Sequence, residues 1–238
     1  MAKTLSALCV AHNAEDLIDA CLRSVGFCDQ IVVVLDRCTD GTRAIALAHG
    51  ARLVEGAWPL EGPRRNAGIA ACTGDWILEI DADERVPEAL AHEIRARIET
   101  SPQGALFIPF ENRIGGRPVL HGWGAYNGVS GKKCLFSKGS KRWGDERLHP
   151  AVHQDGDTSG RLNAPMVHEV YRDLSHMYER LLRYAKLAAE DMVDRGDIPS
   201  GFTTFRRIFS RFGKSYWSRK GHREGTYGLA LGLYSALY

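Results

Sequence analysis

Two aspartates, Asp81 and Asp83, follow the apolar run at residues 76–80 and are separated by one residue. A short apolar run of this kind predicts a buried strand. Because alternate residues of an extended chain point to the same side, the two carboxylates can converge at the end of that strand. Carboxylate oxygens at the carboxyl edge of an α/β sheet suit Mg²⁺ or Mn²⁺ carrying a substrate phosphate. The pattern therefore predicts a site for a metal and a phosphate.

Polar side chains also follow the two apolar runs nearest the N-terminus. Asn13 and Glu15 come after the first run, and Asp36 comes after the second. Polar loops at the carboxyl ends of neighbouring parallel strands form a binding crevice. We therefore expect Asp36 to accept hydrogen bonds from a pyrimidine N–H or a ribose hydroxyl. Asp40 is either a further contact or only the N-cap of the next helix.

A basic segment opens the third predicted helix. Arg65 and Asn66 lie near its N-terminus, where backbone N–H groups and a guanidinium together suit a diphosphate. The neighbouring Arg64 has a simpler interpretation, as part of a solvated basic turn. We expect Arg65 and Asn66, rather than Arg64, to contact the ligand.

The spacing of apolar residues predicts alternating strands and helices over the first hundred or so residues. Strands are expected at 5–10, 31–35, 52–55 and 76–80, and helices at 14–25, 40–49, 63–72 and 87–98. Asp40 and Thr42 can cap the second helix, while Pro63 and Pro87 suit first-turn positions. This alternation is typical of βαβ units around a parallel sheet.

Further along the chain the pattern changes. Two strand-like pieces and three helical patterns are expected at 105–110, 132–137, 174–193, 203–217 and 226–238. We therefore predict an α/β fold, with a mostly parallel sheet flanked by helices and a C-terminal helical extension. The predicted domains are residues 1–170 and 171–238.

Composition narrows the class of protein. The chain has 44% hydrophobic and 25% charged residues and a net charge of +2, so it has no overall signal for binding polyanions. Its six cysteines form no C-x-x-C pair, which argues against a zinc site and a disulfide framework. Residues 1–12 are too short and too weakly apolar for a signal peptide, and no apolar run is long enough for a membrane span. A cytoplasmic protein with reduced thiols is expected.

The order of the polar motifs resembles that of a known enzyme family. The motifs are Asn13-x-Glu15, Asp36-x-x-Thr39-Asp40-Gly41-Thr42, Arg65-Asn66-x-Gly68 and Asp81-x-Asp83. Together they are similar to the inverting family-2 glycosyltransferases of GT-A (Rossmann-like) fold. More narrowly, they resemble the small bacterial members that glucosylate the lipopolysaccharide inner core. The resemblance is close over residues 4–98 and weaker over residues 167–189.

The resemblance implies a role for each motif. Asp36 and Glu15 would hold the nucleoside, with Asn13 in the same nucleotide-sugar site. Arg65 and Asn66 would stand near the diphosphate. Asp83 would bind Mg²⁺ or Mn²⁺, and Asp81 would assist through ribose or indirect contacts. The metal would then offset charge on the leaving nucleoside diphosphate.

An inverting transfer also needs a general base for the acceptor hydroxyl. Asp145 and Glu146 lie in a loop-like context that resembles the base-bearing motif of the larger family. Pro150 departs from that motif, because a glutamate is expected there, and either acid remains a candidate. The alternative is that both carboxylates only form surface ion pairs with Arg142 or Arg147.

The C-terminal segment, residues 200–238, carries seven arginines and lysines against Glu224 alone, interleaved with aromatic residues. This combination predicts contact with an anionic membrane surface. The alternatives are that the aromatic residues pack on the protein itself or against another subunit. Nucleic-acid binding is not expected, because no recognised module accompanies the charge.

Taken together, the motifs predict a metal-dependent inverting glycosyltransferase. It would move a hexose from a nucleotide-diphospho-sugar, a UDP-sugar, to a lipopolysaccharide-type acceptor, either lipid-linked or an oligosaccharide, at the cytoplasmic face of the inner membrane. The alternative enzyme is a sugar-phosphate nucleotidyltransferase, although residues 12–15 lack the glycine-rich basic loop of that class. A third alternative is a non-catalytic protein that binds a nucleotide sugar without transferring or hydrolysing it.

Overall fold

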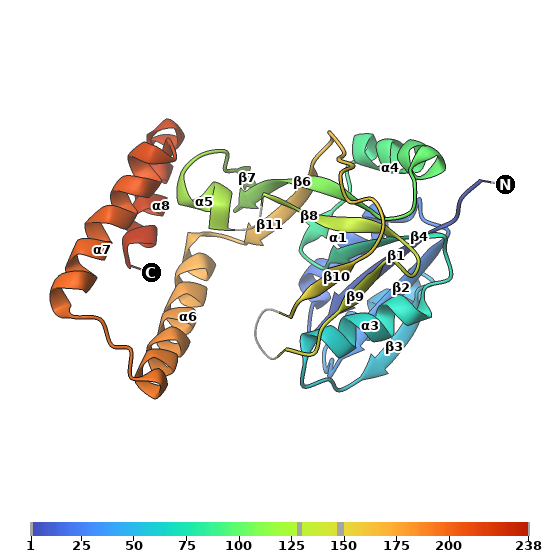
Figure 1. Cartoon of the computed structure of the whole chain (residues 1–238), viewed down its shortest axis with the longest axis horizontal. Coiled ribbons are helices and arrows are strands. Elements are labelled where there is room, and N and C mark those ends of the chain that lie inside the picture. The colour runs from blue at the N-terminus through green and yellow to red at the C-terminus, as the bar shows by residue number, and fades with distance from the viewer. Residues whose placement is uncertain (1, 128–129, 147–149, 238) are drawn as a thin grey trace. The chain divides into compact units, whose positions relative to one another are not determined.

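The structure is a computed structural model that describes residues 2–127, 130–146 and 150–237 (Figure 1). The chain divides into two compact units. The first comprises Met1–Phe110 and Gly131–His168, and the second comprises Glu111–Ser130 and Glu169–Tyr238. The segment Glu111–Ser130, assigned from the sequence to the first domain, groups with the C-terminal helices.

Four parallel strands form the centre of the first unit: β1 (Leu5–Ala11), β2 (Gln30–Asp36), β3 (Arg52–Gly56) and β4 (Trp76–Asp81). β1 lies between β2 and β4, and β3 pairs with the outer edge of β2. In this register Ala7 lies opposite Ile31 on one side and Leu78 on the other. Each strand agrees with its predicted range to within about one residue, so the predicted parallel sheet is confirmed.

The sheet continues beyond β4 with antiparallel strands. β8 (Gly131–Ser137) pairs with β4, and β6 (Ala105–Ile114) pairs with the other edge of β8. Two further pairs form, β5 (Glu84–Arg85) with β11 (Met166–Tyr171) and β9 (Lys141–Trp143) with β10 (Val152–Gln154). The strands predicted at 105–110 and 132–137 are confirmed. The four strands of the two further pairs were not predicted.

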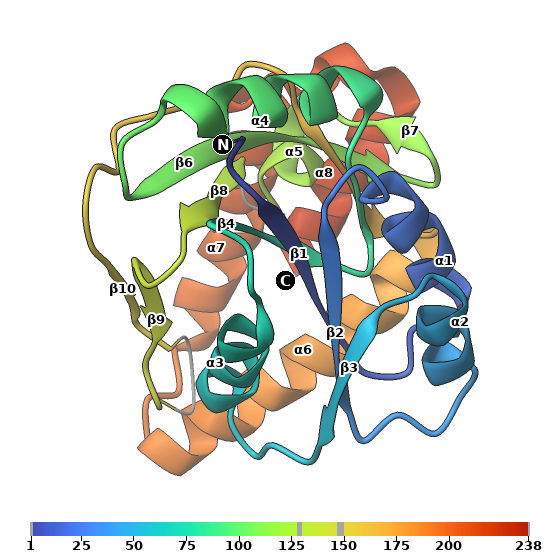
Figure 2. The same cartoon turned by 90° about the vertical axis from the view of Figure 1, so that its right-hand side faces the viewer.

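Helices cover both faces of the sheet of the first unit (Figure 2). One face carries α1 (Glu15–Ser24), α2 (Thr42–Ala48) and α4 (Glu88–Thr100), and the other carries α3 (Glu61–Ala71). Ile18, Ala46 and Ile94 belong to the larger buried cluster, whereas Leu8 and Ala71 belong to the cluster beneath α3. Covered on both faces, the parallel strands are rich in valine and leucine. The α/β prediction is confirmed.

Two predicted helix starts need correction. Gly41 is the N-cap of α2, and Thr42 is its first helical residue rather than a cap. Asp40 accepts from the Thr42 N–H (3.1 Å) but precedes the cap position. Pro87 is itself the N-cap of α4, outside the first turn, whereas Pro63 lies in the first turn of α3.

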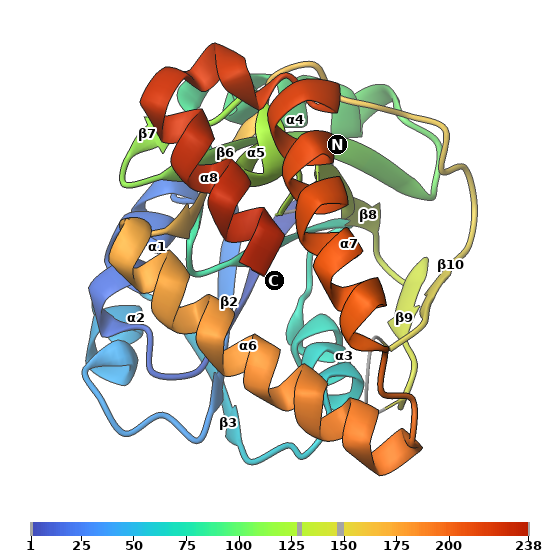
Figure 3. The ribbon, with the colours of Figure 1, turned by 90° about the vertical axis from the view of Figure 1, so that its left-hand side faces the viewer.

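The second unit is mainly helical (Figure 3). Its helices are α5 (Gly122–Asn127), α6 (Leu174–Arg195), α7 (Gly201–Gly213) and α8 (Gly225–Leu237), with a π-helical turn at Lys214–Ser218, a 3₁₀ turn at Gly221–Glu224 and the short strand β7 (Arg117–Pro118). Its core is small and includes Val119, Tyr171, Met177 and Leu231. The predicted C-terminal helical extension is confirmed. Among the described helices, none combines the length and the apolar character needed to cross a bilayer.

Candidate functional site

The loops after β1 and β2 are joined by hydrogen bonds between side chains and backbone. Asn13 Oδ1 accepts from the N–H of Thr39 (2.8 Å), and Glu15 Oε2 accepts from the N–H of Gly41 (2.7 Å). In return, Asp40 Oδ2 accepts from the N–H of Glu15 (3.1 Å). Asn13 has a left-handed backbone (φ 47°), which asparagine tolerates better than most residues. Asn13 and Glu15, the predicted ligand residues, are both exposed. Their hydrogen bonds hold the two loops together and fix the shape of this loop pair.

Asp36 is buried at the end of β2 and accepts hydrogen bonds from three residues. Its Oδ1 accepts from Arg37 Nε (2.9 Å) and the Trp58 N–H (3.1 Å), and its Oδ2 accepts from Arg37 Nη2 (2.9 Å) and Arg64 Nη1 (2.8 Å). Burial alone would raise the pKa of Asp36, but the bonds from Arg37, Trp58 and Arg64 outweigh it and lower that pKa to about 2. Four donors occupy the roughly four acceptor positions of a carboxylate. Arg64, expected in a solvated turn, instead holds this buried acid.

Arg65 links α3 to the end of β4. Its guanidinium donates to Glu61 Oε1 (2.8 Å), Glu79 Oε1 (2.7 Å) and, more weakly, Asp81 Oδ1 (3.3 Å). The same group lies 4.9 Å from the ring centre of Trp143, and the Arg65 side chain is only 12% exposed. The predicted diphosphate residue thus places its charge directly beside Asp81, the first aspartate of the Asp-x-Asp pair.

Asn66 and Gly62 fasten α3 to the β9–β10 hairpin. Asn66 Nδ2 donates to the carbonyl of Trp143 (2.8 Å), and Asn66 Oδ1 accepts from the N–H of the same residue (3.0 Å). One turn earlier, a Cβ on Gly62 would lie 1.7 Å from the carbonyl oxygen of Gly144, so only glycine permits this approach. Asn66 was predicted to contact the nucleotide sugar; here both polar atoms of its amide bond the hairpin backbone. We call these contacts the α3 clamp.

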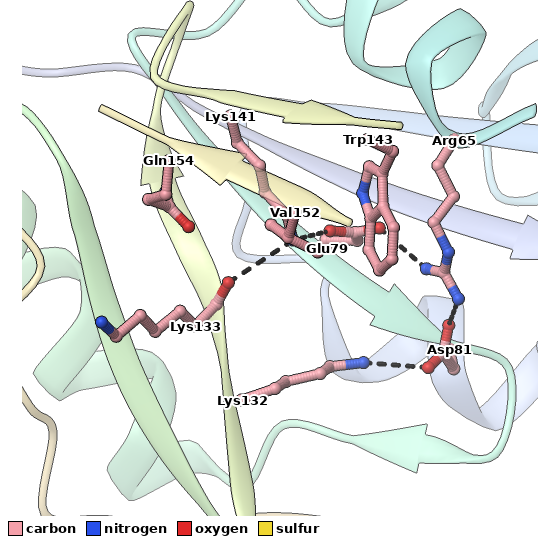
Figure 4. A pocket seen from close by; sticks show the side chains of 9 residues that line it. All are labelled: Arg65, Glu79, Asp81, Lys132, Lys133, Lys141, Trp143, Val152 and Gln154. Carbon is pink, nitrogen blue, oxygen red and sulfur yellow. Dashed lines mark hydrogen bonds and ion pairs between the residues drawn. The ribbon is translucent and has the colours of Figure 1, made fainter. Parts of the chain in front are cut away.

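A pocket of about 470 Å³ lies between β4, β8 and the hairpin (Figure 4). It is lined by Arg65, Glu79, Asp81, Lys132, Lys133, Lys141, Trp143, Val152 and Gln154. Four of these side chains are cationic and two are anionic. Two donors, Trp143 Nε1 and Gln154 Nε2, are buried without a hydrogen-bond partner in the described part of the chain. A pocket with surplus donors is suited to a ligand rich in oxygen acceptors.

Glu79 is the buried anion of this pocket. It accepts from Lys141 Nζ and from Arg65, and both Glu79 and Lys141 are almost fully buried. Burial alone would raise the pKa of Glu79, but the Lys141 and Arg65 charges outweigh it and lower that pKa. The Glu79 carboxylate therefore stays ionised and holds the two cations at the pocket wall.

Lys132 joins Asp81 to Glu84. Its Nζ lies 2.9 Å from Asp81 Oδ2 and 2.9 Å from Glu84 Oε1. Burial works against ionisation of Asp81, but Lys132 and Arg65 outweigh it and hold the pKa of that carboxyl well below its usual range. For Glu84, burial prevails over the attraction of Lys132 and raises the pKa to about 7. Lys132 thus places one positive charge between these two acids.

Asp83, Glu84 and His168 form a group whose ligand atoms lie within 4.8 Å of one another. His168 Nε2 is 3.8 Å from Asp83 Oδ2, and the pairing of β5 with β11 places His168 opposite Glu84. Two carboxylates and one imidazole fit a divalent cation such as Mn²⁺. Asp81 is not in this group, so the two aspartates of the Asp-x-Asp pair do not meet at one point. Glu84 and His168 were not predicted as ligands, although Glu84 directly follows the pair.

The two candidate bases lie in the segment after β9 and are both exposed. Glu146 Oε2 accepts from the N–H of Ala151 (3.0 Å), which lowers the pKa of Glu146. Asp145 has no hydrogen bond or ion pair within the described residues and is the less constrained acid. Neither acid pairs with Arg142 in the described part of the chain, and Arg147 lies outside it. The α3 clamp holds the start of this segment beside the pocket.

Comparison with known proteins identifies relatives over nearly the whole chain. A lipopolysaccharide core biosynthesis glycosyltransferase, LpsC, of Rhizobium meliloti is 26% identical over 250 residues, covering 98% of this chain and 88% of that protein. An uncharacterized glycosyltransferase of Rickettsia bellii is 24% identical and covers 92% of this chain and 78% of that protein. Among solved structures, glucosyl-3-phosphoglycerate synthase of Mycobacterium tuberculosis, in complex with Mn²⁺, UDP and glucosyl-3-phosphoglycerate, has a TM-score of 0.40 and 25% identity. That likeness covers 48% of this chain and 45% of the synthase, so the chain spans less than half of it.

The family follows from a match between this chain and a model of a protein family. The model of glycosyl transferase family 2 matches residues 6–147, which is more than half of the chain and includes every predicted site residue. Family membership favours a glycosyltransferase over the nucleotidyltransferase that the sequence left as an alternative. The chain belongs to glycosyl transferase family 2.

Proposed function

We propose that this glycosyltransferase is metal-dependent and inverting, and that it moves a hexose from a UDP-sugar to a glycan acceptor of the lipopolysaccharide type. The observation that carries the proposal is the position of the Asp83–Glu84–His168 group beside the cationic pocket at the end of β4. The acceptor class is supported by the name of the Rhizobium relative. The nucleotide is supported by the resemblance of the motifs around Asp36.

In this proposal the acceptor hydroxyl loses its proton to Asp145 or Glu146 as its oxygen attacks the anomeric carbon of the hexose. The bond from that carbon to the diphosphate breaks, and the electron pair leaves with the nucleoside diphosphate. Attack from the face opposite the leaving group inverts the configuration. The clamped hairpin supports this assignment, because it fixes the segment that carries both acids.

Charge on the leaving diphosphate needs cations at the end of β4. Arg65 and Lys132 would provide two fixed positive charges there. A divalent cation held by Asp83, Glu84 and His168 would add Lewis-acid stabilisation of the diphosphate oxygens. Trp143 Nε1 and Gln154 Nε2, which have no hydrogen-bond partner among the described residues, would donate to hydroxyl oxygens of the hexose.

The proposal is tested by nucleotide binding followed by transfer. We expect UDP to raise the melting temperature in the presence of Mn²⁺, since a ligand at about 100 times its Kd adds roughly 2.7 kcal/mol of stability. Asp83→Asn and His168→Ala should both lose this shift, whereas the exposed control His92→Ala on α4 should keep it. Either Asp145→Asn or Glu146→Gln should bind UDP and Mn²⁺ normally while transfer of hexose from UDP-glucose to a deglycosylated lipopolysaccharide core stops, and the variant that does so identifies the base.

Two results would contradict the proposal. A shift with UDP that is the same without Mn²⁺ would remove the role given to the metal. Normal nucleotide binding with neither transfer nor donor hydrolysis would instead favour the non-catalytic alternative.

A further inference from the structure

The second unit exposes an unusual amount of apolar surface. Of the sixteen large hydrophobic residues that are exposed in the described chain, thirteen lie between Tyr178 and Leu237. Scattered single residues of this kind are normal on a protein surface, but a contiguous set indicates an interaction site. An exposed apolar set in this unit is therefore a candidate interaction site.

α7 carries the most exposed of these residues, Phe202. Phe202, Phe205 and Phe209 are 78%, 61% and 62% exposed, and no residue of α7 is buried. Their spacing of three and four residues puts them on one side of the helix. The rings of Phe205 and Phe209 contact each other edge to face, with their centres 4.9 Å apart. The three form an aromatic stripe that the unit itself does not cover.

α8 lies beside α7 (Figure 3). The packed side of α8 includes Gly232, where a Cβ would lie 3.1 Å from the ring of Phe212 on α7. Leu229, Leu233 and Leu237 are spaced four residues apart and are 42%, 53% and 65% exposed. We call these leucines and the aromatic stripe of α7 the α7–α8 apolar surface.

The segment that carries this surface has a net positive charge. Residues 200–238 contain seven arginines and lysines and one acid, Glu224. Glu224 is already engaged by Arg117 (3.3 Å) and by the N–H groups of Leu120 and His121 (3.0 Å each). Arg206 and Arg207 are exposed, lie between Phe205 and Phe209 along α7 and make no ion pair within the described residues. The apolar stripe is therefore flanked by uncompensated cations.

We propose that the α7–α8 apolar surface docks on an anionic lipid bilayer. Phenylalanine and leucine side chains would enter the boundary between headgroups and acyl chains, while the arginines would contact lipid phosphates. A second copy of the chain is a poorer occupant, because it would bring a net positive surface against another positive surface. The inference rests on the second unit alone and does not depend on the proposed donor or acceptor.

The test is flotation of the full chain with vesicles of phosphatidylcholine, with and without phosphatidylglycerol. We expect binding to the mixed vesicles only, weakening as salt is raised. Arg206→Gln with Arg207→Gln should reduce partitioning by roughly 30-fold, as expected for two basic residues at an anionic surface. Phe205→Ser with Phe209→Ser should reduce it by roughly tenfold or more. The control Leu47→Ser, at an exposed leucine of α2, should leave it unchanged.

Several outcomes would overturn the proposal. These are no binding to mixed vesicles, equal binding to neutral vesicles, or full binding by the Phe205/Phe209 variant. A wild-type dimer in light scattering that the same variant converts to a monomer would assign the surface to self-association. Melting temperatures measured with UDP and Mn²⁺ report on the donor site separately, and they also show that the variants are folded.

Discussion

Replacing Asn66 by alanine distinguishes a structural role from a ligand role for this residue. The change removes two hydrogen bonds to the backbone of Trp143, each worth about 0.5–1.5 kcal/mol. Alanine recovers up to about 0.7 kcal/mol through its higher helix propensity in α3. The partly buried N–H and carbonyl of Trp143 lose their partners, so the loss in the free energy of unfolding should lie toward the upper end of this range. We expect a net loss of about 2 kcal/mol in the free energy of unfolding, measured by urea denaturation.

The same change should slow transfer without weakening nucleotide binding. Asn66 holds the hairpin that leads to Asp145 and Glu146, so its loss should lower the transfer rate by roughly tenfold, the effect of a small misplacement of a catalytic group. The Kd of UDP with Mn²⁺, measured by calorimetry, should change by less than about threefold, because a change at a site without contact to the ligand leaves the binding free energy nearly unchanged. Ala70→Ser, at an exposed position of the same helix, is the control. Unchanged stability together with a tenfold weaker Kd would refute the structural role and restore Asn66 as a ligand.

Three further perturbations test the pocket and its surroundings. Glu79→Leu should cost about 3–5 kcal/mol in urea unfolding, because Lys141 is left buried without its counter-ion; adding Lys141→Met should recover most of this loss. A double variant as unstable as the single one would show that charge pairing is not the cause. Asp36, with its pKa lowered to about 2 against about 3.8 when unfolded, should contribute roughly 2.4 kcal/mol at neutral pH. Because the folded pKa is the lower one, this stability is lost as pH falls from about 4 to about 2, and Asp36→Asn should flatten that part of the urea-midpoint profile. Gly62→Ala should push the hairpin away and slow transfer while the Kd of UDP is kept; an unchanged transfer rate would contradict the α3 clamp.

Local sequence pattern was sufficient for the elements that lie close together along the chain. The strand ending at Asp81 could be predicted because a continuous apolar run marks a strand covered on both faces. The loops that carry Asn13 and Asp36 follow from the rule that parallel strands present their carboxyl ends at one edge. For the same reason, the start of α3, which follows the carboxyl end of β3, places Arg65 at this edge of the sheet, where Asp81 lies. These inferences need only the spacing of apolar residues along the chain and the topology of a βαβ unit.

The partners of the site could not be predicted in this way, because distant pairings bring them together. Lys132 reaches Asp81 and Glu84 through the pairing of β8 with β4, and His168 reaches Glu84 through the pairing of β11 with β5. The local spacing of apolar residues does not predict which distant strands pair or in which register. Asn66 shows a different case. A polar residue at a helix N-terminus suits a diphosphate, and the sequence does not indicate that its amide also bonds a backbone 77 residues away.

The sequence carries one further signal for the site, within β4. Glu79 interrupts the apolar run of β4 at a position that the two-residue period directs toward α3. A carboxylate in the middle of a buried strand requires a cation, because an unpaired buried charge costs several kcal/mol. Arg65 lies in the predicted helix directly before this strand and is a candidate for that cation, so Glu79 indicates an anchoring role for Arg65 as well as a ligand role. A buried acid within an otherwise apolar strand therefore predicts that cations from distant segments lie close to it. At β4 these cations are Arg65 and Lys141, which line the pocket together with Glu79.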